Sequence, residues 1–126
     1  MKPRFGGRRI AVLGDIAEIE GFEEETYRQI SNDLKNSKID LLVTYGTDSR
    51  TINEYLENAI DSIHLSKESE LISYLKKTIK FGDVVLFKAS GIMHMDRVVR
   101  SVFPVTYAFS RIPYELKVMK WLIKTI

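Results

Sequence analysis

The stretch that decides the fold is Arg9-Ile10-Ala11-Val12-Leu13-Gly14-Asp15, an apolar run that ends in a Gly-Asp pair. A run without polar alternation is typical of a strand that is covered on both faces, as the strands of parallel sheets are. Similar runs follow at residues 39–44 and 84–87, and residues 62–64 are a candidate for a shorter strand. We therefore expect a buried parallel sheet.

Helical periodicity fills the intervals between these runs. Apolar residues three and four positions apart predict helices over residues 22–36 and 48–59, and three glutamates, Glu23 to Glu25, open the first of them, where the helix dipole favours acids. Ser66 is expected to cap a third helix, and a last helix carries Met95, Val98, Val99 and Val102 on one face. Strands that alternate with helices predict an α/β fold, a three-layer, Rossmann-like parallel sheet with right-handed crossovers.

In sheets of this kind, ligands bind beyond the carboxyl ends of the strands. Two loops are therefore the candidate binding loops, residues 14–21 and residues 88–95. We expect residues 1–102 to form the domain. Residues 103–113, which contain two prolines, are expected to be a linker, and residues 114–126 an extra C-terminal amphipathic helix. Packing of this tail helix on its own domain or a neighbouring one is favoured over docking on a membrane surface or a partner.

Composition excludes several classes of protein. A chain of 126 residues holds one domain. The absence of cysteine excludes a disulfide framework, an iron–sulfur cluster, a thiolate zinc site and a cysteine nucleophile, and with two histidines a His-rich metal site is not expected. No stretch approaches the ~20 apolar residues of a membrane span, and no signal segment is evident. A cytoplasmic protein without a transmembrane segment is the expectation.

The charge distribution argues against nucleic-acid binding. Residues 1–9 and 102–126 together carry 8 of the 19 basic residues and one of the 17 acidic residues, so the body of the chain is acidic. A surface that follows phosphates needs a basic stripe on the folded body. No nucleic-acid partner is therefore expected.

Familiar catalytic motifs are missing from the two loops. After Gly14 the next glycine is Gly21, so neither glycine-rich phosphate-binding motif is present. Asp15 and Lys88 at two strand ends suggest a phospho-receiver, but the middle strand ends in Val-Thr-Tyr and offers no acceptor aspartate. Of the two histidines, His64 is expected to be structural, whereas His94 lies on the ligand side of the sheet, where structural and binding roles both stay open.

Two segments resemble conserved motifs of the Mur ligases. The run GRRIAVLGDIAEI at residues 7–19 resembles their GRRIAVLGDMLEL, and GDVVLFKASGIMHMDRVV at residues 82–99 resembles their GDVVLVKGSRGMRMERVV. Taken together, the segments resemble the C-terminal domain of this family from about Gly7 to Val102, and most of all the branch of the family that adds D-alanyl-D-alanine.

The resemblance implies a domain of an ATP-dependent amide ligase of peptidoglycan precursor synthesis. In that family ATP, with magnesium, phosphorylates the carboxylate of a UDP-muramoyl tripeptide, and the amine of D-alanyl-D-alanine attacks the acyl phosphate. ATP and magnesium are implied only for a full-length ligase, whose N-terminal and central domains would be the partners of this chain. The chain alone lacks the P-loop and is expected to bind no cofactor and to be inactive.

The resemblance also implies roles for five residues. Lys88 would bind an anionic carboxylate or phosphate, Ser90 would donate a hydrogen bond to the same group, and His94 stands at a family arginine. Asp15 and Glu18 would face the dipeptide amine or orient their loop. Ordinary capping and surface roles stay open for Asp15, Lys88 and Ser90.

The sequence also departs from the family pattern. Residues that differ from the family motif are Tyr27 for histidine, Ala89 for glycine, Gly91 and His94 for arginines, and Asp96 for glutamate. Loss of both arginines removes two cationic groups suited to carboxylates. Two alternatives follow, a domain belonging to a longer ligase or a free-standing, non-catalytic binding module that kept the fold. A homodimer that covers an exposed sheet edge is compatible with either.

Overall fold

The computed structural model describes residues 7–16, 19, 21–90 and 93–103 of the chain. Strands and helices alternate throughout this part, in the order β1 (Arg9–Gly14), α1 (Glu23–Lys35), β2 (Leu41–Tyr45), α2 (Arg50–Leu56), β3 (Asp61–Leu65), α3 (Glu68–Thr78), β4 (Val84–Lys88) and α4 (Met95–Val102). The predicted linker and tail helix lie outside the described residues, apart from Phe103, which follows α4 directly.

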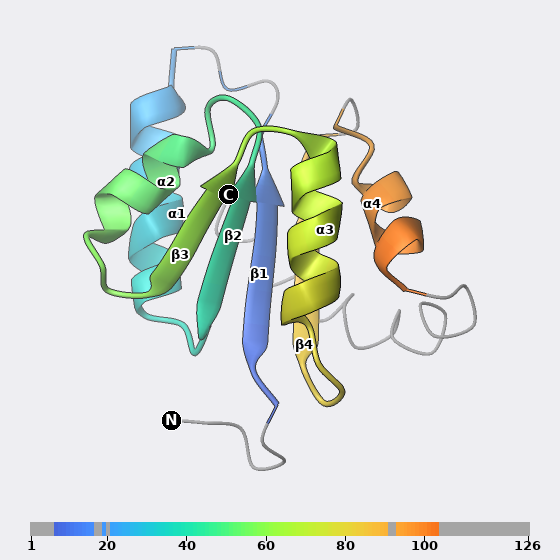
Figure 1. The fold of residues 1–126 in the computed structure, drawn as a ribbon. Helices are drawn as coiled ribbons and strands as arrows, with labels where there is room; N and C mark the ends of the chain where they lie inside the picture. The colour runs from blue at the N-terminus through green and yellow to red at the C-terminus, as the bar shows by residue number, and fades with distance from the viewer. Residues whose placement is uncertain (1–6, 17–18, 20, 91–92, 104–126) are drawn as a thin grey trace.

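The four strands form one parallel sheet in the order β3-β2-β1-β4. Helices α1 and α2 cover one face of the sheet and α3 and α4 cover the other (Figure 1). This arrangement confirms the expected three-layer α/β fold. The chain moves from β1 to β2 on one side and returns to place β4 on the other side of β1, so the helices that follow β1 and β4 lie on opposite faces of the sheet. Such a point is where open α/β sheets bind ligands.

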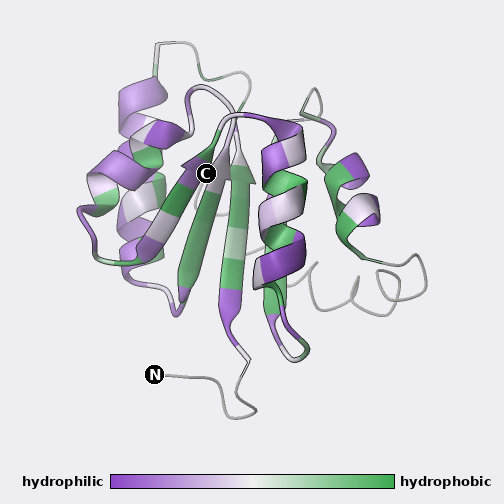
Figure 2. Cartoon of the chain, viewed as in Figure 1, coloured by the Kyte–Doolittle hydropathy of each residue, from purple (hydrophilic) through white to green (hydrophobic). Residues whose placement is uncertain are grey.

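The strand β1 explains why the sheet is buried on both faces. Ala11 and Leu13 pack under α1 and α2, whereas Ile10 and Val12 pack under α3 and α4, and all four are at most 3% exposed. Figure 2 shows the apolar residues concentrated on the strands and on the inner faces of the helices. Each face of the sheet therefore has its own apolar cluster, as the unbroken apolar run predicts.

At the amino end of the sheet, Asp83 joins the starts of β1 and β4. Its carboxylate, which is buried, accepts hydrogen bonds from the backbone N–H groups of Arg8 (2.8 Å) and Lys80 (2.9 Å) and from the Arg8 guanidinium (3.2 Å). The segment before β1 and the turn before β4 lie close together here, because a side chain at Gly7 would overlap the carbonyl of Gly82. The junction holds β1 and the edge strand β4 together at the end opposite to the candidate loops.

Two predicted helix boundaries were wrong. The helix predicted for residues 48–59 ends at Leu56, because Glu57 and Asn58 adopt the left-handed conformation (φ 49° and 69°). Ser66 does not cap α3, for which Lys67 is the residue before the helix, and the Lys67 N–H donates to the carboxylate of Glu70 (3.3 Å). Within the described residues, no helix is long and apolar enough to cross a membrane.

Candidate functional site

The loops after β1 and β4 meet at the carboxyl end of the sheet. The Ser90 N–H donates a hydrogen bond of 2.9 Å to the Asp15 carbonyl oxygen. Beside this bond, a side chain at Gly14 would come within 2.7 Å of Ala89, so the second loop packs directly on the end of β1. The two candidate loops of the sequence thus form one surface.

The carboxylate of Asp15 is hydrogen-bonded to the loop between β2 and α2. It accepts hydrogen bonds from three successive backbone N–H groups, those of Thr47 (3.0 Å), Asp48 (2.9 Å) and Ser49 (2.9 Å). These bonds hold the turn that leads into α2. Of the two roles expected for Asp15, the geometry favours orientation of a loop, and direct contact with an amine stays a prediction.

Lys88 and Ser90 both belong to the stretch that runs from the end of β4 into this surface. Lys88 is the last residue of β4, where it lies beside Leu13 of β1, and no hydrogen bond or ion pair joins its side chain to another described residue. The Ser90 hydroxyl is buried and lacks a hydrogen-bond partner within the described part of the chain. Two other buried polar side-chain atoms of the described residues also lack such a partner, Tyr27 Oη and His64 Nε2, so a binding role for Ser90 stays a prediction.

His94 and Glu18 are placed differently from these two residues. His94 is exposed and precedes α4 in the left-handed conformation (φ 51°). Behind it, Arg97 of α4 makes two bonds, of 2.6 and 2.9 Å, to the carboxylate of Glu68 in α3. The Arg97 hydrogen bonds and, to a lesser degree, the charge of His94 lower the pKa of Glu68. Glu18 lies outside the described residues.

An acidic hollow next to the Asp15 loop has no counterpart in the sequence analysis. It measures about 410 Å³ between α1 and α2, and its lining residues are Glu23, Glu24, Tyr27, Asp48, Thr51 and Tyr55. Burial raises the pKa of Tyr27, and the carboxylates of Asp15 and Asp48 raise it further. The sequence shows the three glutamates at the start of α1, which could have indicated an acidic surface. It does not show that they lie near Asp48, because that depends on the packing of α1 against α2.

The described residues contain no cluster of metal ligands. No group of three or more Asp, Glu or His side chains within them could hold a metal ion.

His64, which was expected to be structural, lies in β3 beside β2. Its Nδ1 is 2.8 Å from the Thr44 hydroxyl. This contact joins two neighbouring strands, and the Nε2 of the same ring is buried without a hydrogen-bond partner among the described residues.

Comparison with known proteins gives two findings. The family model described as "Mur ligase, glutamate ligase domain" matches residues 1–91. The UDP-N-acetylmuramoyl-tripeptide–D-alanyl-D-alanine ligase of Bacillus subtilis (strain 168) is 28% identical over 99 residues, which cover 76% of this chain and 22% of the relative. The chain thus spans about a fifth of the length of the curated relative that it matches.

Proposed function

Because the chain belongs to the Mur ligase family through its glutamate ligase domain, we propose that it is the C-terminal substrate-binding domain of an ATP-dependent amide ligase. The reaction we propose adds D-alanyl-D-alanine to a UDP-muramoyl tripeptide during peptidoglycan precursor synthesis in the cytoplasm. Its support is the similarity to a ligase of that name. The observation that carries the proposal is the contact between the loops after β1 and β4, where the Ser90 N–H bonds to the Asp15 carbonyl oxygen and Lys88 ends β4 without a side-chain partner among the described residues.

In this proposal, Lys88 and Ser90 bind the carboxylate of the incoming dipeptide. An ammonium group and a hydroxyl are both hydrogen-bond donors, and donors of this kind form their strongest bonds with an ionised acceptor. Because Ser90 is held by its backbone bond to Asp15, its hydroxyl is positioned before the ligand arrives. The dipeptide would therefore meet a loop that is already held on the end of β1.

The acidic hollow suits the other end of the dipeptide. Glu23, Glu24 and Asp48 surround it, and the turn that carries Asp48 is held by Asp15. Negative charges attract an ammonium group, so we assign to this side the orientation of the dipeptide amine. Asp15 is then a positioning residue, which keeps the turn before α2 in place beside the dipeptide.

We assign the binding of ATP and magnesium to another domain. What supports this assignment is that the sequence lacks a glycine-rich phosphate-binding motif. We propose that the central domain of a longer ligase binds both and phosphorylates the tripeptide carboxylate, while its N-terminal domain completes the enzyme. The part assigned to this chain is to bind and orient the amine substrate.

The test is an NMR titration of the chain with D-alanyl-D-alanine. We expect the amide signals of Ser90 and Asp96 to shift in proportion to bound dipeptide. Replacing Lys88→Ala should weaken binding about tenfold, since one charge-assisted hydrogen bond is lost. Lys80→Ala, at the opposite end of the sheet, is the matched control and should bind as the unaltered chain does. Shifts elsewhere on the domain, or equal binding by both variants, would contradict the assignment.

A second candidate function is a free-standing binding module without catalytic activity. It is favoured by one specific observation, the replacement of two family arginines by Gly91 and the exposed His94, which weakens a site for carboxylates. An immunoblot of the source cells with an antibody against this domain separates the two candidates. A band several times larger than 14.6 kDa supports the ligase, whereas a band at 14.6 kDa supports the module.

A further inference from the structure

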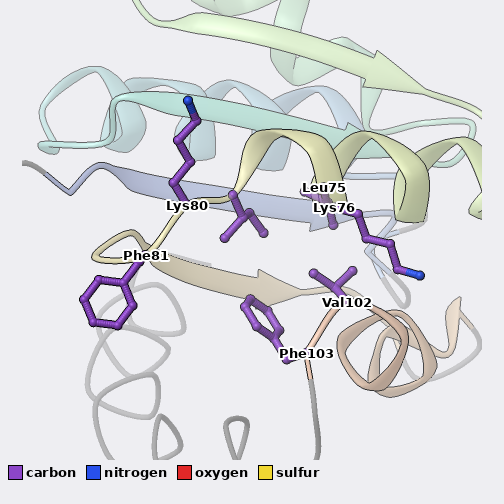
Figure 3. A pocket seen from close by; sticks show the side chains of 7 residues that line it. Leu75, Lys76, Lys80, Phe81, Val102 and Phe103 are labelled. Carbon is purple, nitrogen blue, oxygen red and sulfur yellow. The ribbon is translucent and has the colours of Figure 1, made fainter.

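A second surface lies at the amino end of the sheet, far from the candidate loops. Here the C-terminal turn of α3 and the end of α4 enclose a hollow of about 290 Å³ (Figure 3). Leu75, Val102 and Phe103 line it with apolar atoms, and Lys76, Lys80 and Phe81 stand around its edge. We call these six residues the Phe81 surface.

Phe81 is almost completely exposed. Its side chain is 95% accessible at the turn between α3 and β4, and in Figure 3 it points away from the domain. Among the described residues, the other exposed large apolar side chain is Phe22, at 64%, which lies beside the three glutamates of α1. Exposure of a phenylalanine ring to water is unfavourable, so a ring placed at the tip of a turn is suited to insertion into an apolar phase.

The charge around Phe81 is positive. The lysines of the last turn of α3 and of the turn before β4 are Lys76, Lys77 and Lys80. On α4, Arg97 is paired with Glu68 and Arg100 with Asp96. The acid next to this turn, Asp83, is buried and paired with Arg8, so the three lysines leave the turn positive. Lysines beside an exposed aromatic ring are the combination that binds at the interface of an anionic bilayer.

The sequence after Phe103 and before β1 is also rich in basic residues. Phe103 leads into residues 104–126, which carry four basic residues and one acid, Glu115, among many apolar ones. The amino end of β1 follows a segment that holds Lys2 and Arg4. Basic and apolar residues thus continue in the sequence before β1 and after Phe103.

We propose that the Phe81 surface docks on a membrane that contains anionic lipids. The ring of Phe81 enters the interface between headgroups and acyl chains, and Lys76 and Lys80 lie among the phosphates. Since all four strands run from this end towards the candidate loops, Lys88 and Ser90 then face away from the membrane. The inference goes beyond the proposed ligase function and does not depend on it.

Vesicle co-sedimentation of the full chain tests the proposal. Vesicles of phosphatidylcholine alone are compared with vesicles of phosphatidylcholine and phosphatidylglycerol in equal parts. We expect binding to the anionic vesicles that weakens as salt is raised. Phe81→Ser should lower that binding about tenfold, whereas Phe22→Ser, the matched exposed phenylalanine at the acidic end, should leave it unchanged.

The charge contribution is tested by the double variant Lys76→Gln, Lys80→Gln. Each lysine near an anionic surface contributes about a fivefold gain in binding, so the double variant should bind about 30-fold more weakly. Thermal melting verifies that each variant is folded, which is expected since all replaced side chains are exposed.

Three outcomes would overturn the proposal. The first is equal binding to neutral and anionic vesicles, and the second is binding that Phe81→Ser leaves unchanged, which would place the contact elsewhere in the chain. The third is absence of vesicle binding together with self-association that depends on Phe81, measured by analytical ultracentrifugation. That result would assign the surface to a second copy of the chain.

Discussion

The carboxylate of Asp15 accepts hydrogen bonds from the backbone N–H groups of residues 47–49. These bonds predict that the stability of the protein depends on this carboxylate. Replacing Asp15→Asn puts an amide that can only donate on one side of this turn, which leaves backbone donors unpaired. We expect the free energy of unfolding to fall by about 1–2 kcal/mol. The measurement is urea denaturation followed by circular dichroism. Asp48→Asn, whose exposed carboxylate makes no hydrogen bond within the described residues, is the control and should unfold with the unaltered chain.

A substitution at Gly46 tests the same contact of Asp15 with the turn before α2. It has φ +119°, and a Cβ there would lie 2.7 Å from the Asp15 carboxylate. Gly46→Ala therefore adds a collision with Asp15 to backbone strain. In a double-mutant cycle, the cost of Gly46→Ala should be smaller in the Asp15→Ala background, because the collision is gone while the strain stays. Additive costs would show that the two residues are not in contact.

The position of a site residue could be predicted from the sequence in some cases, and its contacts could not. The positions of Asp15 and Lys88 at strand ends follow from the apolar runs, so both could be placed on the ligand side from the sequence. The partners of Asp15 could not, because residues 47–49 reach it only through the pairing of β2 with β1. Ser90 carries no local pattern that marks its hydroxyl as buried and unpartnered, since that depends on how its loop packs on Gly14.

Among the elements, the junction of β1 with the turn before β4 predicts a dependence of stability on pH. Burial alone would raise the pKa of Asp83, but hydrogen bonds from the backbone of Arg8 and Lys80 and from the Arg8 guanidinium lower it below 3.8. A carboxyl group with a lowered pKa in the folded state stabilises the protein above its unfolded pKa, and this stabilisation is lost as pH falls through the folded pKa. The free energy of unfolding should therefore decrease as pH is lowered from about 5 towards 3.

Comparison with Asp83→Asn isolates this contribution. The variant should be less stable at pH 7 by about 1–3 kcal/mol, and the difference between the two proteins should shrink in acid, because only the unaltered chain loses the carboxylate. Asp61→Asn, at an exposed position of β3, should follow the unaltered chain at every pH. Urea midpoints measured across the range provide the curves. A constant difference between the unaltered chain and Asp83→Asn would disprove the role of the junction.

The elements themselves followed the sequence closely where burial decides. The strand predicted at residues 9–14 has those bounds, and the run at residues 84–87 extends by one residue to Lys88. Prediction failed at the end of α2, where periodicity continued through Ala59 while the backbone turned left-handed at Glu57. Periodicity reports which side chains face the core, and it carries little information on where the chain must turn to enter the next strand.

For the whole molecule, the sheet joins two apolar clusters that meet only through its strands. Ile30 belongs to the cluster under α1 and α2, and Ile10 to the cluster under α3 and α4, and each is 1% exposed. Ile→Val at either position removes one buried methyl group, so each should lower the free energy of unfolding by about 0.5–1.5 kcal/mol. Because the sheet separates the two side chains, the costs should add in the double variant to within about 0.5 kcal/mol.

The same variants show whether the described domain unfolds as one unit. Strands β1 and β2 contribute side chains to both clusters, so neither cluster can be lost while the sheet stays intact. Each variant should therefore move a single urea transition, with far-ultraviolet circular dichroism and the near-ultraviolet tyrosine signal giving one midpoint. If Ile30→Val moved the midpoint of one probe and Ile10→Val that of the other, the clusters would be separate cooperative units. One transition would mean that a loosened amino-end junction also weakens the surface that carries Lys88 and Ser90.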